Sequence, residues 1–302
     1  MTAPEREERS AGGGRASTGR GPSSVAVFTR RNPEKTVAAV HRLAELANAA
    51  GVELLVPSEE VDKHGLQALP GATFDADPLT ADLALVFGGD GTILTTMRRF
   101  AGRDVPVFAV NFGAVGFLST VESGDLDEAL GSALRGEYEV LPLPVLSADV
   151  NGAPQVAVND ISLHRRQDLR VAELAFSVAG QELGMVRCDG LVVATPAGST
   201  GYNLANGGPV LAWGVEGFVV SFIAPHTLTA RALVVAPDDV LEVRNRSPEE
   251  PVDVTTDGRR VRALEPGESL EIRFHDDQAL LAQAAGTTFY DRLREKFGRL
   301  SY

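Results

Sequence analysis

The sequence predicts two domains of different class: an α/β domain with a parallel sheet, then a β-rich, antiparallel, sandwich-like domain. Up to about residue 143, short apolar runs alternate with segments of helical periodicity, which favours a parallel sheet covered by helices. Beyond that point β-rich runs follow one another, separated by Gly, Asn and Asp turns. The 302 residues, 44% of them hydrophobic, are enough to bury two cores. We expect the domains at 25–143 and 144–280.

Residues 1–24 contain five Gly, several Ser and Thr, and almost no large apolar side chain. Such a composition cannot offset the entropy lost on ordering. We therefore expect a disordered, solvated tail without a function of its own.

The first domain is expected to begin with a buried strand at 25–28. A helix at 33–50 follows, with its apolar residues on one face, and Gly51 ends it. Further strands are expected at 52–56, 83–87 and 107–110, with a helix from Ile93 to about Phe100 before the last of them.

In the second domain, Asp257-Gly258 indicates a hairpin between 252–256 and 259–263. Helical periodicity returns only near the C-terminus, at 287–297. We expect a C-terminal helix within 281–302 to pack back on the first domain. The other strands of the second domain are expected at 156–164, 169–178, 191–195, 218–223, 232–235 and 269–274.

Charge and composition exclude several classes of partner. The 28 Lys and Arg against 41 Asp and Glu give a net charge of −13, which argues against a broad nucleic-acid-binding surface. The single cysteine cannot form an intrachain disulfide, and the N-terminus lacks the apolar stretch of a signal peptide. No run approaches the ~18 apolar residues of a membrane span. We expect a soluble cytoplasmic protein with no nucleic-acid or membrane partner.

Glycine turns follow the apolar strands. Gly88-Gly89-Asp90-Gly91-Thr92 lies between a strand and a helix, where backbone N–H groups can approach a phosphate. Asp90 would repel that phosphate unless it accepts a hydroxyl proton or holds Mg²⁺. The alternative is an Asp that caps the helix in a tight turn. A second turn at 111–118, taken alone, indicates only a glycine turn with Phe117 and Leu118 in the core.

The stretch 189–209 is the most specific element, because it combines Pro196, Gly198 and two hydroxyl residues with the aromatic Tyr202. An aromatic face suits a nucleobase or nicotinamide ring, and Asp189 could accept hydrogen bonds from a ribose. Capping and ordinary turns are the alternative. Asn159 and Asp160 interrupt an apolar strand, which indicates either a β-bulge or a polar site.

These motifs, in this order, resemble the NAD kinase family over nearly the whole chain after residue 24. The first glycine motif alone also occurs in diacylglycerol-type lipid kinases and phosphofructokinases, whereas the 195–209 stretch separates this family from them. The shared motifs are 88–92, 159–160, 195–202 with Gly207-Gly208-Pro209, 223–228 and the terminal 289–297.

The resemblance implies transfer of the γ-phosphate of ATP to the 2′-hydroxyl of the adenosine ribose of NAD, giving NADP. It implies an α/β N-terminal domain, a β-rich NAD-binding C-terminal domain, and a homodimer or homotetramer. ATP would be the donor, with Mg²⁺ or another divalent metal held mainly by ATP, which fits the acidic balance and the lack of a Gly-x-x-x-x-Gly-Lys loop.

Residue roles follow from the matching positions. Asp90 would be the general base, beside a phosphate loop of Gly88, Gly89, Gly91 and Thr92. Arg170 and Arg259 are further candidate substrate contacts. The expected NAD contacts are Asp90, Gly91, Asn159, Asp160, Arg187, Asp189, Thr200, Gly201, Tyr202, Asn203, Leu204 and Ala205.

The chain departs from the family pattern where hydroxyl and polar residues are usual. These departures leave two other functions open: a non-catalytic NAD(P) sensor on the same fold, or a kinase for another hydroxyl such as a lipid or sugar. Arg259, where the family often has Gln, could favour a phosphorylated ligand. The other changed positions are Ala114, Ala197, Gly201 and Ala205, with Asp160 where Glu is usual.

Overall fold

The computed structural model describes residues 15–16, 21–66, 68–113, 116–150, 152–166 and 170–298. Most of the predicted tail and Ala114 lie outside these residues. Within the predicted tail, β1 (Arg15–Ala16) pairs with β8 (Glu139–Val150), and β2 already begins at Ser24. Backbone pairing needs no apolar side chain, so composition gave no signal for it.

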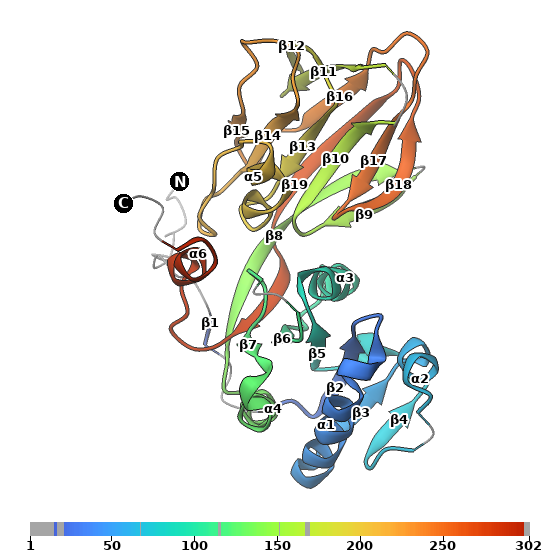
Figure 1. Cartoon of the computed structure of the whole chain (residues 1–302), viewed down its shortest axis with the longest axis vertical. Helices are drawn as coiled ribbons and strands as arrows, with labels where there is room; N and C mark the ends of the chain where they lie inside the picture. Colours follow the sequence, from blue (N-terminus) through green and yellow to red (C-terminus); the bar gives the residue numbers. More distant parts are fainter. Residues whose placement is uncertain are drawn as a thin grey trace, which may run out of the picture. The chain divides into compact units, whose positions relative to one another are not determined.

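The chain divides into two compact units. Unit 1 comprises 1–93, 105–142 and 280–302, and unit 2 comprises 94–104 and 143–279. The fold class is as predicted: unit 1 has a parallel sheet with helices, and unit 2 is a β-rich, antiparallel structure (Figure 1).

Unit 1 is built on parallel strands in the order β4-β3-β2-β5-β6, and the end of β19 continues the sheet beside β6. Helices α1 and α4 pack against each other and bury Leu43 and Leu130 with the strands. The bounds are β2 Ser24–Thr29, α1 Val37–Ala50, β3 Glu53–Val56, α2 Ser58–His64, β4 Ala72–Phe74, β5 Leu83–Gly88, α3 Asp90–Phe100 (shared with unit 2), β6 Val107–Asn111, β7 Val121–Glu122, α4 Leu126–Arg135 and α6 Phe289–Phe297.

Unit 2 contains two groups of antiparallel strands, β12-β11-β16-β19 and β15-β14-β13-β10-β17-β18, with β8 and β9 paired to each other. Their apolar side chains form one core that includes Leu174, Leu191 and Val254. The bounds are β9 Ala153–Ala157, β10 Asp160–Arg165, β11 Ala172–Val178, β12 Gln181–Cys188, β13 Gly190–Ala194, α5 Tyr202–Ala205, β14 Phe218–Ile223, β15 Leu233–Val235, β16 Leu241–Asn245, β17 Val252–Thr256, β18 Arg259–Leu264 and β19 Ser269–Gln283.

Most predicted strands are confirmed, and the hairpin at Asp257-Gly258 is confirmed. The expectation of one strand over 156–164 is wrong, because the chain breaks between β9 and β10 at Val158 and Asn159. The predicted helix within 281–302 is shorter, since β19 continues to Gln283 and α6 begins at Phe289. The change of pattern at 141–144 lies inside strand β8. Helices α2 and α4 and strands β4, β7, β8, β12 and β16 are not predicted from the sequence. No helix of the described residues is long and apolar enough to cross a membrane.

Candidate functional site

The first glycine motif lies where β5 ends and α3 begins. The amides of Thr92 and Ile93 donate to the carbonyl of Gly89 at 2.9 and 3.2 Å, which starts the helix. A Cβ on Gly88 would lie 2.7 Å from the Thr92 side chain, so the tight turn requires glycine there. The motif therefore places Asp90 in the first turn of α3.

The two glycine turns of unit 1 meet at the Asp90 carboxylate. Its Oδ2 accepts the amide of Phe117 at 3.1 Å, and its Oδ1 accepts the amide of Leu118 at 3.4 Å. A Cβ on Gly116 would overlap the Asp90 carboxylate, so only glycine allows this approach. Phe117 and Leu118 are buried, as the sequence predicted for this turn. That the two turns share Asp90 could not be seen from either motif alone.

Further contacts fix the second turn. The amide of Phe112 donates to the carbonyl of Gly88 at 3.0 Å, and the amide of Gly113 donates to the Asn111 side chain at 2.9 Å. Arg30 donates to the Phe112 carbonyl at 2.8 Å. On the other flank, Arg292 of α6 donates to the carbonyls of Phe117 and Ser119. Sequence reasoning assigned no role to Arg30 or Arg292.

In unit 2, Asp257 holds the Asn159–Asp160 segment by its backbone. The Asp257 carboxylate accepts the amides of Val158, Asn159 and Asp160 at 3.1, 2.7 and 3.1 Å, and its side chain is fully buried. Arg98 contacts the same carboxylate at 3.4 Å. The sequence indicated Asp257 only as a turn residue, because its partners lie about a hundred residues earlier in the chain.

Asp160 and Asp257 form a pair of buried carboxyl groups. Burial, and then the charge of Asp257, raises the pKa of Asp160 to about 7. Burial also raises the pKa of Asp257, although the three backbone amides and Arg98 counteract it. Near neutral pH, Asp160 can therefore either donate or accept a hydrogen bond.

The turn after β13 packs directly on Asn159. The Thr195 amide donates to the Asn159 carbonyl at 2.9 Å, and the Thr195 hydroxyl donates to the Val158 carbonyl at 2.7 Å. A Cβ on Gly198 would overlap the backbone of Asn159. Within the part of the chain that the structure describes, the buried Asn159 Oδ1 has no hydrogen-bond partner. A buried acceptor of this kind is ready for a donor on a ligand.

Several polar residues of the turn support the turn itself. The Ser199 hydroxyl donates to the Pro196 carbonyl at 2.7 Å and accepts the Leu211 amide at 2.8 Å. The buried Asn203 amide donates to the carbonyls of Ser199 and Pro209, both at 2.9 Å. The Thr200 hydroxyl donates to the Ala197 carbonyl at 3.2 Å. Direct NAD contacts by the side chains of Asn203 and Thr200 stay predictions, and in this structure both side chains shape the turn.

Tyr202 offers a flat aromatic face at the end of the turn. Its ring stacks on His164 with centroids 5.5 Å apart, and Tyr202 is 37% exposed. Burial raises the pKa of Tyr202, and the charges of Asp160 and Asp189 act in the same direction. Asp189 pairs with Arg165 at 2.5 Å, and strand pairing places His164 opposite Gly190, the residue after Asp189. Tyr202, which stacks on His164, and Asp189, which pairs with Arg165, therefore both contact the end of β10.

Other predicted contacts lie at exposed positions. Arg187 is 63% exposed and pairs with Glu173 at 3.4 Å, and Arg170 and Arg259 are exposed. Gly201 and Ala205 are exposed on the turn, with Leu204 half-buried. The substrate contacts expected of Arg187, Arg170 and Arg259 stay predictions.

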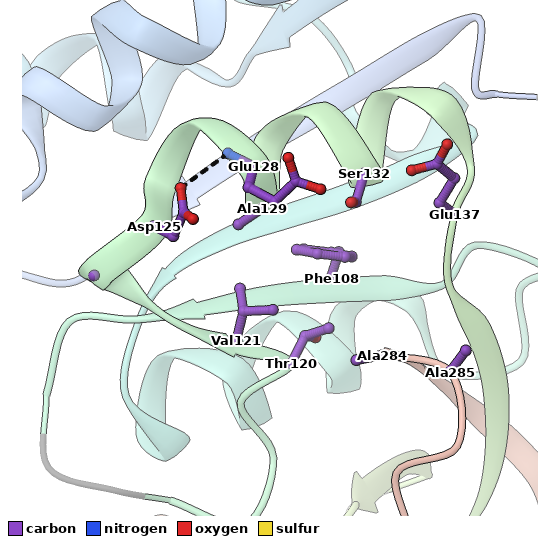
Figure 2. Close-up of a pocket in the computed structure, with 11 residues that line it drawn as sticks. Phe108, Thr120, Val121, Asp125, Glu128, Ala129, Ser132, Glu137, Ala284 and Ala285 are labelled. Atoms are coloured by element: carbon purple, nitrogen blue, oxygen red, sulfur yellow. Dashed lines mark hydrogen bonds between the residues drawn. The ribbon is translucent and has the colours of Figure 1, made fainter.

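Unit 1 also contains a cavity of about 420 Å³. Figure 2 shows Ala129 and Ser132 of α4 facing Phe108 and Val121 across it. Its polar groups have partners: Thr120 donates to the Ala282 carbonyl at 2.6 Å, and Asp125 accepts the Glu128 amide. None of the predicted site residues lines this cavity, so we do not assign the site to it. Among the described residues, no group of three His, Cys, Asp or Glu is placed to hold a metal ion.

Comparisons with known proteins identify the family of both parts of the chain. Residues 25–138 match the ATP-NAD kinase N-terminal domain, and residues 158–283 match the ATP-NAD kinase C-terminal domain. The chain is 31% identical over 277 residues to the NAD kinase of Geotalea daltonii, which covers 90% of this chain and 97% of that one. It is 37% identical over 230 residues to the NAD kinase of Carboxydothermus hydrogenoformans, covering 74% and 82%.

Solved structures show the same fold. A yeast NADH kinase complexed with NADH has a TM-score of 0.83 at 21% identity, covering 93% of this chain and 89% of that one. An NAD kinase from Archaeoglobus fulgidus in complex with ATP has a TM-score of 0.68 at 26% identity, covering 91% and 97%.

The carboxyl pair in unit 2 predicts a dependence of stability on pH. Because burial raises the pKa of Asp160 from 3.8 to about 7, this carboxyl group binds more protons in the folded chain than in the unfolded chain between those values. Its contribution to the free energy of unfolding therefore falls as the pH rises through this window. We expect Asp160→Asn to flatten this fall and to stabilise the ligand-free protein at pH 8 by about 1–3 kcal/mol.

Urea unfolding at pH 5, 6, 7 and 8 measures this difference. Asp238→Asn, which replaces an exposed carboxyl group of the same unit, is the matched control. Parallel pH curves for the wild type and Asp160→Asn would contradict the assignment of the raised pKa.

Proposed function

The chain belongs to the ATP-NAD kinase family, and on that premise we propose which of its residues carry out the reaction. The reaction is the ATP-dependent phosphorylation of NAD to NADP. One observation carries the proposal: the Asp90 carboxylate lies where two glycine turns meet, held by the amides of Phe117 and Leu118. The close approach of Gly116, where a Cβ would overlap the Asp90 carboxylate, supports a functional reason for that position, because capping α3 alone would not require it.

We propose that Asp90 is the general base. As the 2′-hydroxyl oxygen of the adenosine ribose forms its bond to the γ-phosphorus of ATP, its proton passes to Asp90. The bond from the γ-phosphorus to the bridging oxygen breaks, and ADP leaves with that electron pair. The loop of Gly88, Gly89, Gly91 and Thr92, at the start of the 11-residue helix α3, lies against the phosphate groups, while the Thr92 amide itself donates to the Gly89 carbonyl.

We propose that NAD is recognised by the turn of unit 2. The unpartnered Asn159 Oδ1 accepts a hydrogen bond from the ligand, and Tyr202 stacks on one of its rings. Asp160 and Asp189 bind ribose or base donors. Backbone groups at Thr200, Gly201 and Ala205 line the pocket, and Asn203 and Leu204 hold its shape. Arg187, Arg170 and Arg259 contact the charged part of the substrates.

We propose that the divalent metal, Mg²⁺ or a similar ion, enters with ATP as part of the substrate. The oxygens of Asp257 already accept three backbone amides. Of the two buried carboxyl groups, only Asp160 could therefore serve as a metal ligand, and one carboxyl group is too few to hold the ion without ATP. The net charge of −13 makes a metal-neutralised triphosphate a better ligand than the free one.

Of the other functions considered from the sequence, neither the non-catalytic sensor nor the kinase for another hydroxyl is favoured by the comparisons. We propose that the enzyme acts in the cytoplasm as a homodimer or homotetramer. Light scattering during size-exclusion chromatography measures the mass of the assembly, and a monomer at all concentrations would overturn the oligomeric part.

Asp90→Asn tests the base directly. We expect kcat for NADP formation to fall by at least about 100-fold, because the amide cannot take the hydroxyl proton. A coupled NADP assay measures the rate, and calorimetry should show that NAD still binds. Asp127→Asn, which removes an exposed carboxyl group of the same unit, is the control. An unchanged kcat in Asp90→Asn would refute the proposed base.

Gly116→Ala tests the close approach at Asp90. The added methyl group would overlap the carboxylate and displace it, so we expect kcat to fall by about 10–100-fold. Gly124→Ala is the matched control, because a Cβ there meets no atom within 4 Å. Equal rates for the two alanine variants would show that the position of Asp90 is not constrained as we describe.

Arg259→Gln tests the preference for a phosphorylated ligand. We expect the affinity for NADP to fall by about 3–10-fold and the affinity for NAD to change little, because an exposed guanidinium gains most from a phosphate. Arg260→Gln is the control, since neighbouring residues of β18 point to opposite faces. Calorimetry with both dinucleotides measures the difference, and equal losses for both would contradict it.

A further inference from the structure

Helix α6 carries a buried arginine that the reaction as described does not use. Arg292 is 6% exposed, and its Nη1 donates to the Phe117 carbonyl at 2.9 Å and to the Ser119 carbonyl at 2.5 Å. Burial lowers the pKa of Arg292, while Glu295 and Asp90 act to raise it. A guanidinium stays charged under such conditions, so the site keeps a buried cation close to Asp90.

The segment 117–119 connects Arg292 to Asp90. The Phe117 carbonyl, which Arg292 binds, and the Leu118 amide, which Asp90 binds, belong to the same peptide unit. A peptide unit is planar, with its carbonyl and N–H pointing in opposite directions. Fixing the carbonyl therefore fixes the direction of the N–H group, and a charged donor on the carbonyl also polarises the peptide.

Helix α6 is itself held firmly enough to act as a support. Thr288 and Asp291 form a capping box at its start. The rings of Phe289 and Phe297 pack on Phe117 with centroids 6.3 and 5.8 Å away, and Lys296 lies over the Phe117 ring at 4.9 Å. The helix thus contacts the segment through side chains as well as through Arg292.

We infer that Arg292 is a positioning residue for Asp90: by binding the Phe117 and Ser119 carbonyls it holds the 117–119 segment in place and fixes the direction of the Leu118 amide toward the Asp90 carboxylate. The inference rests on the proposed role of Asp90 as the base. Arg292 lies about two hundred residues after Asp90 in the sequence, and it binds the segment whose amides bind the Asp90 carboxylate. Losing Arg292 would free the peptide plane and let the carboxylate shift, without removing any group that binds NAD or ATP.

The test is a double-mutant cycle between Arg292 and Asp90. We expect Arg292→Met to lower kcat by about 10–100-fold while KM for NAD and ATP stays within about threefold, since misplacement of a reacting group acts on the transition state. Arg292→Lys keeps a charged donor and should recover part of kcat. In the Asp90→Asn background, Arg292→Met should lower kcat by no more than about twofold.

Controls separate this role from a structural one. Arg294→Met removes an exposed arginine of the same helix and should leave kcat unchanged. Thermal unfolding of every variant detects a folding defect, and if Arg292→Met does not fold, the cycle is run with Arg292→Lys. Equal losses of kcat in the wild-type and Asp90→Asn backgrounds would overturn the positioning role. Full activity of Asp90→Asn alone would instead refute the proposed base.

Discussion

In each of the two units, the candidate functional residues depend on a carboxylate that accepts consecutive backbone N–H groups of a distant segment. In unit 1, Asp90 accepts the amides of Phe117 and Leu118, and in unit 2, Asp257 accepts those of Val158, Asn159 and Asp160. Each bond satisfies a backbone donor that would otherwise be buried without a partner, and each compensates part of the cost of burying a carboxylate. A carboxylate can accept these N–H groups only where the backbone of the distant segment comes very close to it. This requirement determines which residues are allowed at the neighbouring positions.

The close approach explains which glycines matter. Gly116 and Gly198 have no positive φ, so they are not needed for backbone conformation. They are needed because a Cβ would overlap Asp90 in one case and the Asn159 backbone in the other. By contrast Gly207 has φ of 74° and a Cβ there would meet nothing, so it serves the turn by conformation alone. Glycines that look alike in a motif therefore have two different physical tasks.

The sequence predicted the local parts of the site and missed the contacts between them. Strands and the 88–92 turn follow from apolar runs and glycines that are adjacent in the chain, so periodicity and motif spacing suffice. The partnership of Asp257 with Asn159, or of Arg292 with the segment that holds Asp90, joins residues about 100 and 175 positions apart. No local pattern encodes such a pairing. The break at Val158 and Asn159 is not predicted by the apolar pattern for the same reason, because the amides of these residues pair with the Asp257 side chain instead of a neighbouring strand.

The hydrogen bonds of the 195–209 turn show whether Ala197 and Ala205, which depart from the family pattern, weaken the turn. Thr195, Ser199 and Asn203 supply the side-chain bonds that hold the turn, and all three are present. Ala197 is buried and contributes only its carbonyl, to the Thr200 hydroxyl, while Ala205 is exposed. A hydroxyl missing from either position removes no bond on which the turn depends. The substitutions therefore leave in place the hydrogen bonds that hold the turn, because those bonds come from residues that the chain retains.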